Sequence, residues 1–121
     1  MPASKRAIDL VHRAVNRSLR YMTDQAQYGL ADHWVTEPRS GWGDCEDYAL
    51  TKRARLLTHG AAPSDLRIVL GTNWRGQSHA VLYARDDRGQ WWVLDNESSR
   101  IVKAGRHSFR PVPSGIYAAP A

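Results

Sequence analysis

Residues 79–96 read HAVLYARDDRGQWWVLDN, two apolar runs on either side of an Asp-Asp-Arg-Gly turn. The runs His79–Arg85 and Gln90–Asn96 are rich in Val, Leu, Tyr and Trp, residues that favour β-strands. Gly89 suits the left-handed position that closes a three-residue hairpin loop. This stretch therefore predicts an antiparallel β-hairpin.

The length of the loop sets which side chains share a face of the hairpin. With a three-residue loop Val81 faces Asp95, so His79 and Asp95 become diagonal neighbours on one side of the sheet. A four-residue loop would bring Asn96 to that side instead. Either side chain can hold an imidazole in one tautomer. Gly89 at the end of the loop favours Asp95.

Helical patterns precede the hairpin. Apolar residues recur at helical spacing over Ser4–Met22, which predicts an amphipathic helix packed on the core. A second helix is expected to begin at Asp44, a good N-cap, with Asp47 in the capping-box position. Gly60 is its natural end.

Short strand patterns complete the chain. Leu66–Leu70 indicates a strand before the hairpin, and Ile101–Val102 with Ser108–Val112 indicates a further short strand pair. Prolines in the last segment favour an edge position. Helices followed by strands predict one α+β domain over residues 1–121, in which N-terminal helices pack on an antiparallel β-sheet.

Cys45 is the single cysteine, so an internal disulfide and a four-cysteine zinc site are excluded. It lies at the expected start of the second helix, where unpaired N–H groups and the helix dipole favour a thiolate. The same N–H groups can stabilise an oxyanion. The alternative is a buried structural cysteine.

Three carboxylates stand beside this thiol: Asp44, Glu46 and Asp47. Their negative charge should raise the pKa of the thiol, which opposes its ionisation. A hard cation held by these oxygens would offset that effect, and calcium is the natural candidate. The alternative is a charged first helical turn that holds no ion.

Five histidines are candidates for the base that activates the thiol. His79 opens an apolar strand, and we expect the second helix to pack on the face of the sheet that carries it. His12 lies among polar residues of the first helix and is expected at the surface. His59 suits a helix C-terminus. His33 and His107 fall in loops, where the pattern assigns them no role.

Composition excludes some classes of protein. The net charge is +5, but the basic residues are scattered and no nucleic-acid-binding motif accompanies them, so nucleic acid is not an expected partner. No stretch approaches the roughly 18 apolar residues of a membrane-spanning helix. The N-terminus lacks the apolar core of a secretory signal, which indicates a cytoplasmic protein if the chain is full length.

Three motifs together resemble the bacterial transglutaminase-like cysteine proteinases: Gly-Asp-Cys-Glu-Asp-Tyr-Ala at 43–49, His-Ala-Val-Leu at 79–82 and Val-Leu-Asp-Asn at 93–96. The segment from Asp32-His33-Trp34 to Pro38 is also similar to that family. The resemblance implies a papain-like, transglutaminase-like core and a periplasmic location. It assigns catalysis to Cys45, His79 and Asp95, and calcium to the acids at 44, 46 and 47.

The expected function is that of a cysteine peptidase that hydrolyses a protein or peptide substrate through a thioester intermediate. Two alternatives keep the fold. An amine in place of water as acceptor would make the chain a transglutaminase. Loss of catalysis would leave an idle peptide-binding module, although the presence of all three residue types argues against it.

Overall fold

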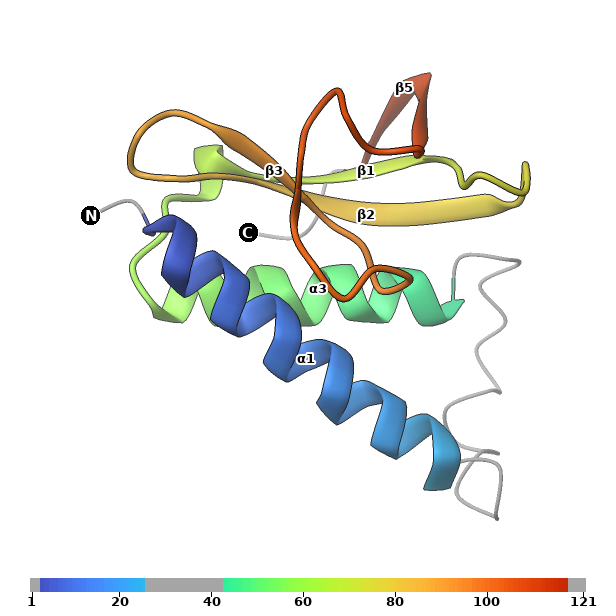
Figure 1. The fold of residues 1–121 in the computed structure, drawn as a ribbon, viewed down its shortest axis with the longest axis horizontal. Helices are drawn as coiled ribbons and strands as arrows, with labels where there is room; N and C mark the ends of the chain where they lie inside the picture. The colour runs from blue at the N-terminus through green and yellow to red at the C-terminus, as the bar shows by residue number, and fades with distance from the viewer. Residues whose placement is uncertain (1–2, 26–42, 118–121) are drawn as a thin grey trace.

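The computed structural model describes residues 3–25 and 43–117 and places two helices against one face of an antiparallel sheet (Figure 1). Within these residues no helix is both long enough and apolar enough to cross a bilayer. The segment similar to the family at 32–38 lies outside the described residues. The elements are α1 (Lys5–Gln25), α3 (Gly43–Thr58), the 3-10 turn η2 (Pro63–Asp65), β1 (Leu66–Thr72), β2 (Ser78–Arg85), β3 (Trp91–Leu94), β4 (Val102–Lys103) and β5 (Arg110–Tyr117).

Both helices agree with the sequence patterns. α1 forms because its apolar residues recur on one stripe, and Ile8 and Val15 on that stripe are fully buried. α3 begins one residue before the expected N-cap, Asp44, and ends at Thr58, two residues before Gly60. A difference of one residue at a helix end is within the normal variation of such boundaries.

The sheet has the order β4-β3-β2-β1-β5, and each pair of neighbouring strands is antiparallel. β4 and β5 therefore lie at opposite edges, so the expectation that these two segments pair with each other is wrong. β4 extends the hairpin beside β3, whereas β5 crosses over to β1. The edge position expected for the proline-containing strand is confirmed.

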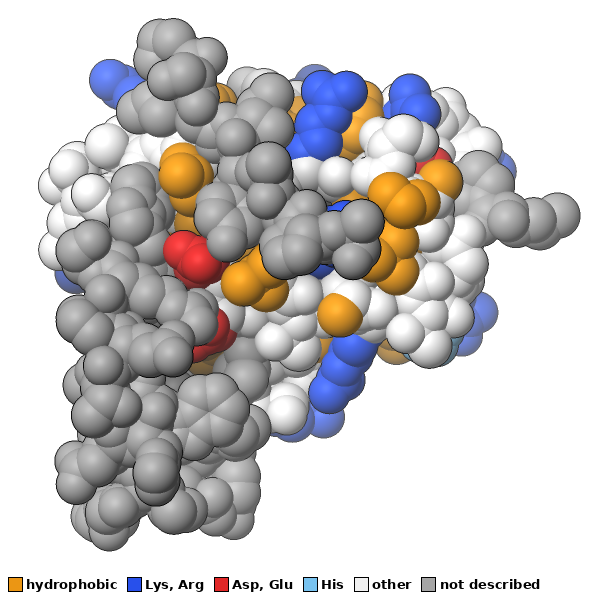
Figure 2. Space-filling model, turned by 180° about the vertical axis from the view of Figure 1, so that it is seen from behind, with side chains coloured by type: hydrophobic (Ala, Val, Ile, Leu, Met, Phe, Trp, Pro, Cys, Tyr) orange, Lys and Arg blue, Asp and Glu red, His pale blue; other side chains and the backbone are white. Residues whose placement is uncertain are grey.

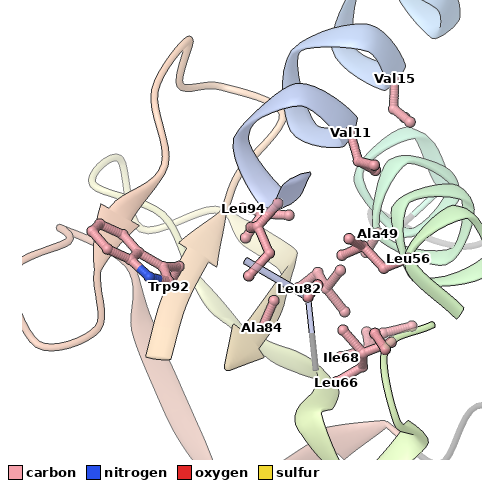
Figure 3. Close-up of a cluster of buried hydrophobic side chains, with 13 residues drawn as sticks. Val11, Val15, Ala49, Leu56, Leu66, Ile68, Leu82, Ala84, Trp92 and Leu94 are labelled. Atoms are coloured by element: carbon pink, nitrogen blue, oxygen red, sulfur yellow. The ribbon is translucent and has the colours of Figure 1, made fainter. Parts of the chain in front are cut away.

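The main core lies between the helices and the sheet (Figure 3). Alternate residues of the central strands point toward the helices, and the residues between them point to the other face, as the period of two in a strand requires. The helix-facing cluster includes Val11, Ala49, Leu56, Ile68, Leu82 and Leu94, and the opposite cluster contains Val69, Val81, Val93 and Phe109.

The β2–β3 hairpin has the predicted register, with Leu82 opposite Leu94 and Tyr83 opposite Val93. Gly89 closes the turn at φ 83°, in the left-handed region. Asp86 holds the turn, because its Oδ1 accepts hydrogen bonds from the backbone N–H groups of residues 88 and 90, at 2.8 and 2.9 Å. The local turn chemistry thus fixes which residues face one another at the far end of the hairpin.

Candidate active site

Cys45 lies in the first turn of α3 and is 7% exposed. Its Sγ accepts a hydrogen bond from the backbone N–H of Ala80 at 3.3 Å. That N–H is available because β3 ends at Leu94, before it reaches the residue that would pair with Ala80. This bond holds the sulfur beside β2, the strand that carries His79.

His79 and Asp95 are brought together as the hairpin register predicts. Nε2 of His79 donates to Oδ1 of Asp95 at 2.7 Å, and the two residues are each 3% exposed. The carboxylate is itself fixed, because the backbone N–H of Glu97 donates to the same oxygen at 2.8 Å. Asn96, the alternative orienting residue, does not make this contact, so the hairpin register selects Asp95.

The thiol and the imidazole meet at the end of the sheet and not across its helix-covered face. His79 has the same parity as Val81, which packs in the cluster opposite the helices. The expectation that α3 packs on the face carrying His79 is therefore wrong. The imidazole is nevertheless hydrogen-bonded to Cys45, because His79 is the second residue of β2 and lies beyond the last residue of β3.

The surroundings of His79 favour its protonated form. Burial lowers the pKa of the imidazole. Hydrogen bonds to Asp95 and Cys45 and the charges of both groups raise it by more than burial lowers it, so the pKa is about 10. Burial raises the pKa of the Asp95 carboxyl, but hydrogen bonds from His107, His79 and the Glu97 backbone outweigh it and hold that pKa well below its usual range. At neutral pH these groups form an imidazolium–carboxylate pair beside the thiol.

Two of the three acids expected to bind calcium have side chains in the described part of the chain. Glu46 and Asp47 are half-buried in α3 beside Cys45, and the side chain of Asp44 lies outside the described part of the chain. A second group, His79, Asp95 and Glu97, has ligand atoms within 4.8 Å of one another. Calcium binds through oxygen, and the imidazole nitrogen here is bonded to Asp95, so this second group does not suit that ion. Carboxylate oxygens, which Asp44, Glu46 and Asp47 all carry, are the kind of ligand that calcium prefers.

A buried polar network joins the two helices to the turn after β3. Lys52 is fully buried, and its Nζ donates to Nδ1 of His12 at 3.1 Å. Nε2 of His12 in turn donates to the carbonyl of Ser98 at 2.8 Å. The expected surface position of His12 is therefore wrong, since packing of α1 on α3 buries it completely.

Burial dominates the protonation of this network. It lowers the pKa of Lys52 to about 7, although the negative charge of Asp95 acts in the opposite direction. It also lowers the pKa of His12 to about 4, with the Lys52 charge as the next cause. The sequence gives only one indirect signal for this cluster. Lys52 follows Cys45 by seven residues, a spacing that places the two side chains on similar sides of the helix.

His107 is the functional candidate that the loop pattern did not indicate. Its Nε2 lies 3.1 Å from Oδ2 of Asp95. Both residues line an open pocket of about 350 Å³, together with Trp74, Glu97, Arg106 and others. Trp74 is 67% exposed at the β1–β2 turn. The pocket thus lies beside the pair formed by His107 and Asp95.

Charge on the surface follows the scattered distribution of the sequence. On the face seen in Figure 2, the Lys and Arg side chains are separated patches near the periphery and do not merge into one basic groove. Several stack on aromatic rings instead, such as Arg67 over Trp91 at 4.9 Å and Lys5 over Trp92 at 4.8 Å. These cations contribute to packing through their contact with the rings.

A thiol at a helix start, beside an imidazole held by a carboxylate on an antiparallel sheet, is the arrangement of side chains used by Cys–His hydrolases. The sequence comparison agrees. The chain belongs to the family of bacterial transglutaminase-like cysteine proteinases, whose model matches residues 1–113. No curated protein resembles the chain closely enough in sequence to count as a match.

Solved structures of LapG from Legionella pneumophila are similar to this chain. The calcium-bound form and a second LapG structure each share 34% identity, with a TM-score of 0.51, over 58% of this chain and 40% of LapG. The EGTA-treated form gives the same identity and TM-score over 39% of LapG. The similarity thus spans less than half of the LapG chain and supports the transglutaminase-like α+β fold.

Proposed function

We propose that the chain is a cysteine peptidase that cleaves a peptide bond of a protein substrate, with Cys45 as nucleophile, His79 as acid and base, and Asp95 as the group that orients His79. The observation that carries the proposal is the 2.7 Å hydrogen bond between His79 and Asp95, next to a thiol that is bonded to a backbone N–H. Membership of the cysteine proteinase family supports the same assignment.

The chemistry follows from the protonation of the site. The thiolate of Cys45 attacks the scissile carbonyl carbon, and N–H groups at the start of α3 stabilise the oxyanion. The imidazolium of His79 gives its proton to the leaving amine, and a thioester remains on sulfur. His79, now neutral, takes a proton from water as the water oxygen adds to the thioester carbonyl. The C–S bond then breaks, which releases the acid product and leaves the thiolate of Cys45 beside the imidazolium of His79, as at the start.

Asp95 acts through His79 and does not touch the reacting atoms. By accepting from Nε2 it leaves Nδ1 as the ring nitrogen that can face the thiol. It also stabilises the imidazolium, as the raised pKa of His79 indicates. Asp95 is thus an orienting residue in this mechanism.

Calcium is part of the proposal as a support for the nucleophile. Asp44, Glu46 and Asp47 would hold the ion, since their carboxylate oxygens are the ligands it prefers. The ion would neutralise negative charge next to Cys45 and so favour the thiolate. LapG, the relative of known structure, has been solved in a calcium-bound form.

A peptide library tests the proposal. The protein is incubated with proteome-derived peptides in the presence of calcium, and new termini are identified by mass spectrometry. We expect cleavage by the unaltered protein and by His59→Ala, a change of an exposed histidine in the same molecule. Cleavage should be lost in Cys45→Ala and His79→Ala. Undiminished cleavage by Cys45→Ala would refute the assignment of the nucleophile.

A further inference from the structure

Asp95 lies between two imidazoles. His79 approaches one carboxylate oxygen, Oδ1, at 2.7 Å, and Nε2 of His107 approaches the other, Oδ2, at 3.1 Å. The side chain of Asp95 is 4% exposed and that of His107 is 11% exposed, so water has little access to the bonds between them. A buried carboxylate needs its lone pairs satisfied, and His107 serves the oxygen that His79 does not.

The tautomer of His107 is fixed by its own backbone. The N–H of Phe109 donates to Nδ1 of His107 at 2.9 Å, so this nitrogen carries no proton. In a neutral imidazole the proton is then on Nε2, the nitrogen that faces Asp95. The bond from Phe109 therefore makes His107 a donor toward the carboxylate.

Phe109 also ties this segment to the rest of the site. Its ring is 5% exposed and packs with Val69, Val81 and Val93 on the sheet face opposite the helices. The same ring contacts His79 edge to face, with centroids 6.1 Å apart, and lies 6.5 Å from the ring of His107. The segment that carries His107 is thus anchored in a hydrophobic cluster and is not a loose loop beside the site.

Gly71 of β1 makes this anchoring possible. A Cβ atom at Gly71 would lie 2.7 Å from Cζ of Phe109 and 2.1 Å from the carbonyl oxygen of Arg110. Only glycine lets the segment approach β1 this closely. The close approach brings His107 within reach of Asp95, although the two are twelve residues apart in the chain.

From this geometry we propose that His107 is a positioning residue for the peptidase reaction: it donates from Nε2 to Oδ2 of Asp95 and so holds the carboxylate in the orientation that His79 requires. The inference rests on the proposed function. It adds a second imidazole behind the Cys45–His79–Asp95 triad. The lowered pKa of Asp95 agrees, because after the opposing effect of burial the His107 hydrogen bond is its largest cause.

Two amide substitutions separate the roles of the two ring nitrogens. In His107→Gln the amide nitrogen reaches the place of Nε2 and keeps the donor to Asp95. In His107→Asn the amide oxygen takes the place of Nδ1 and keeps the acceptor for Phe109, but the side chain is too short to donate to Asp95. The rate of Cys45 alkylation by iodoacetamide at neutral pH, with calcium present, is the readout for both.

We expect His107→Asn to react roughly 10- to 100-fold more slowly than the unaltered protein, the range typical for loss of an outer-shell hydrogen bond. His107→Gln should stay within about 3-fold, and His59→Gln is the control for an exposed histidine. Equal rates in His107→Asn and the unaltered protein would overturn the proposal, as would equal slowing by both amides, since a structural role predicts no rescue.

His79→Ala separates failure of this inference from failure of the proposed function. If it leaves the alkylation rate unchanged, His79 does not activate the thiol and both proposals fall. If it slows alkylation while His107→Asn does not, only the role of His107 falls.

The imidazole ¹H–¹⁵N spectrum of the unaltered protein gives a test that does not depend on the folding of any variant. We expect the proton of neutral His107 on Nε2, and a proton on Nδ1 would overturn the proposal.

Discussion

Replacing Lys52 by Met should expose a pH dependence of stability that the unaltered protein conceals. Lys52 is fully buried and donates to His12, and its pKa is lowered by burial to about 7. His79 is buried beside Asp95, and its pKa is raised to about 10 because the effects of Asp95 and Cys45 exceed that of burial. The two groups respond to pH in opposite directions over the same range.

The signs follow from counting protons in the folded and unfolded states. Between about pH 7 and 10, His79 is protonated only in the folded protein, so its contribution to stability is present below pH 6.5 and is lost as pH rises through 10. Lys52 is protonated only in the unfolded protein over that range, so its contribution makes the unfolding free energy increase as pH rises. Each proton is worth about 1.4 kcal/mol per pH unit, and the two nearly cancel.

The assay is urea unfolding followed by tryptophan fluorescence, at several values between about pH 7.5 and about pH 9. Cys45→Ser serves as the background, because a hydroxyl does not titrate in this range as a thiol does. Across the interval the background should gain about 2 kcal/mol of unfolding free energy relative to Lys52→Met, because only the background keeps the buried lysine; this difference does not depend on how much Cys45 contributes to the pKa of His79. Lys103→Met, at an exposed lysine, is the matched control and should follow the background. Parallel curves for Lys52→Met and the control would refute the reasoning.

Three further predictions concern the site and its support. Asp95→Asn should lower peptide hydrolysis by about 10²- to 10⁴-fold, because an amide can donate to His79 and select the wrong tautomer; kcat measured within 3-fold of the unaltered value would contradict this. Gly71→Ala should cost about 1–3 kcal/mol in urea unfolding, since its Cβ would overlap the carbonyl oxygen of Arg110, and an unchanged midpoint would argue against that contact. Chelation of calcium by EGTA should reduce hydrolysis at least about 10-fold, and adding calcium should restore it. Magnesium should not restore it, because magnesium demands a stricter ligand geometry than calcium does. Full activity in EGTA would remove calcium from the mechanism.

The parts of the fold set by local chemistry could be predicted from the sequence. The hairpin register follows from Gly89 and the three-residue loop, and that register alone brings His79 and Asp95 together. The helix that carries Cys45 could be predicted because capping residues mark its start and a glycine marks its end. In each case the deciding interactions lie within a few residues of one another.

Interactions between distant segments could not be predicted in this way. His107 reaches Asp95 because a segment far along the chain packs against β1, and nothing near His107 in the sequence indicates it. Lys52 and His12 look like ordinary surface residues of two amphipathic helices, yet the helices meet where both are buried. The pairing of β4 with β3, and of β5 with β1, likewise depends on which edges the hairpin leaves open.

The most direct test of the account is the rate at which iodoacetamide alkylates Cys45 at about pH 6, where an unassisted thiol is almost entirely protonated. The account predicts rapid, stoichiometric alkylation in the unaltered protein, and a loss of at least about 10-fold in His79→Ala. A rate as slow as that of a free cysteine at this pH, unaffected by His79→Ala, would contradict the claim that this imidazole activates the thiol.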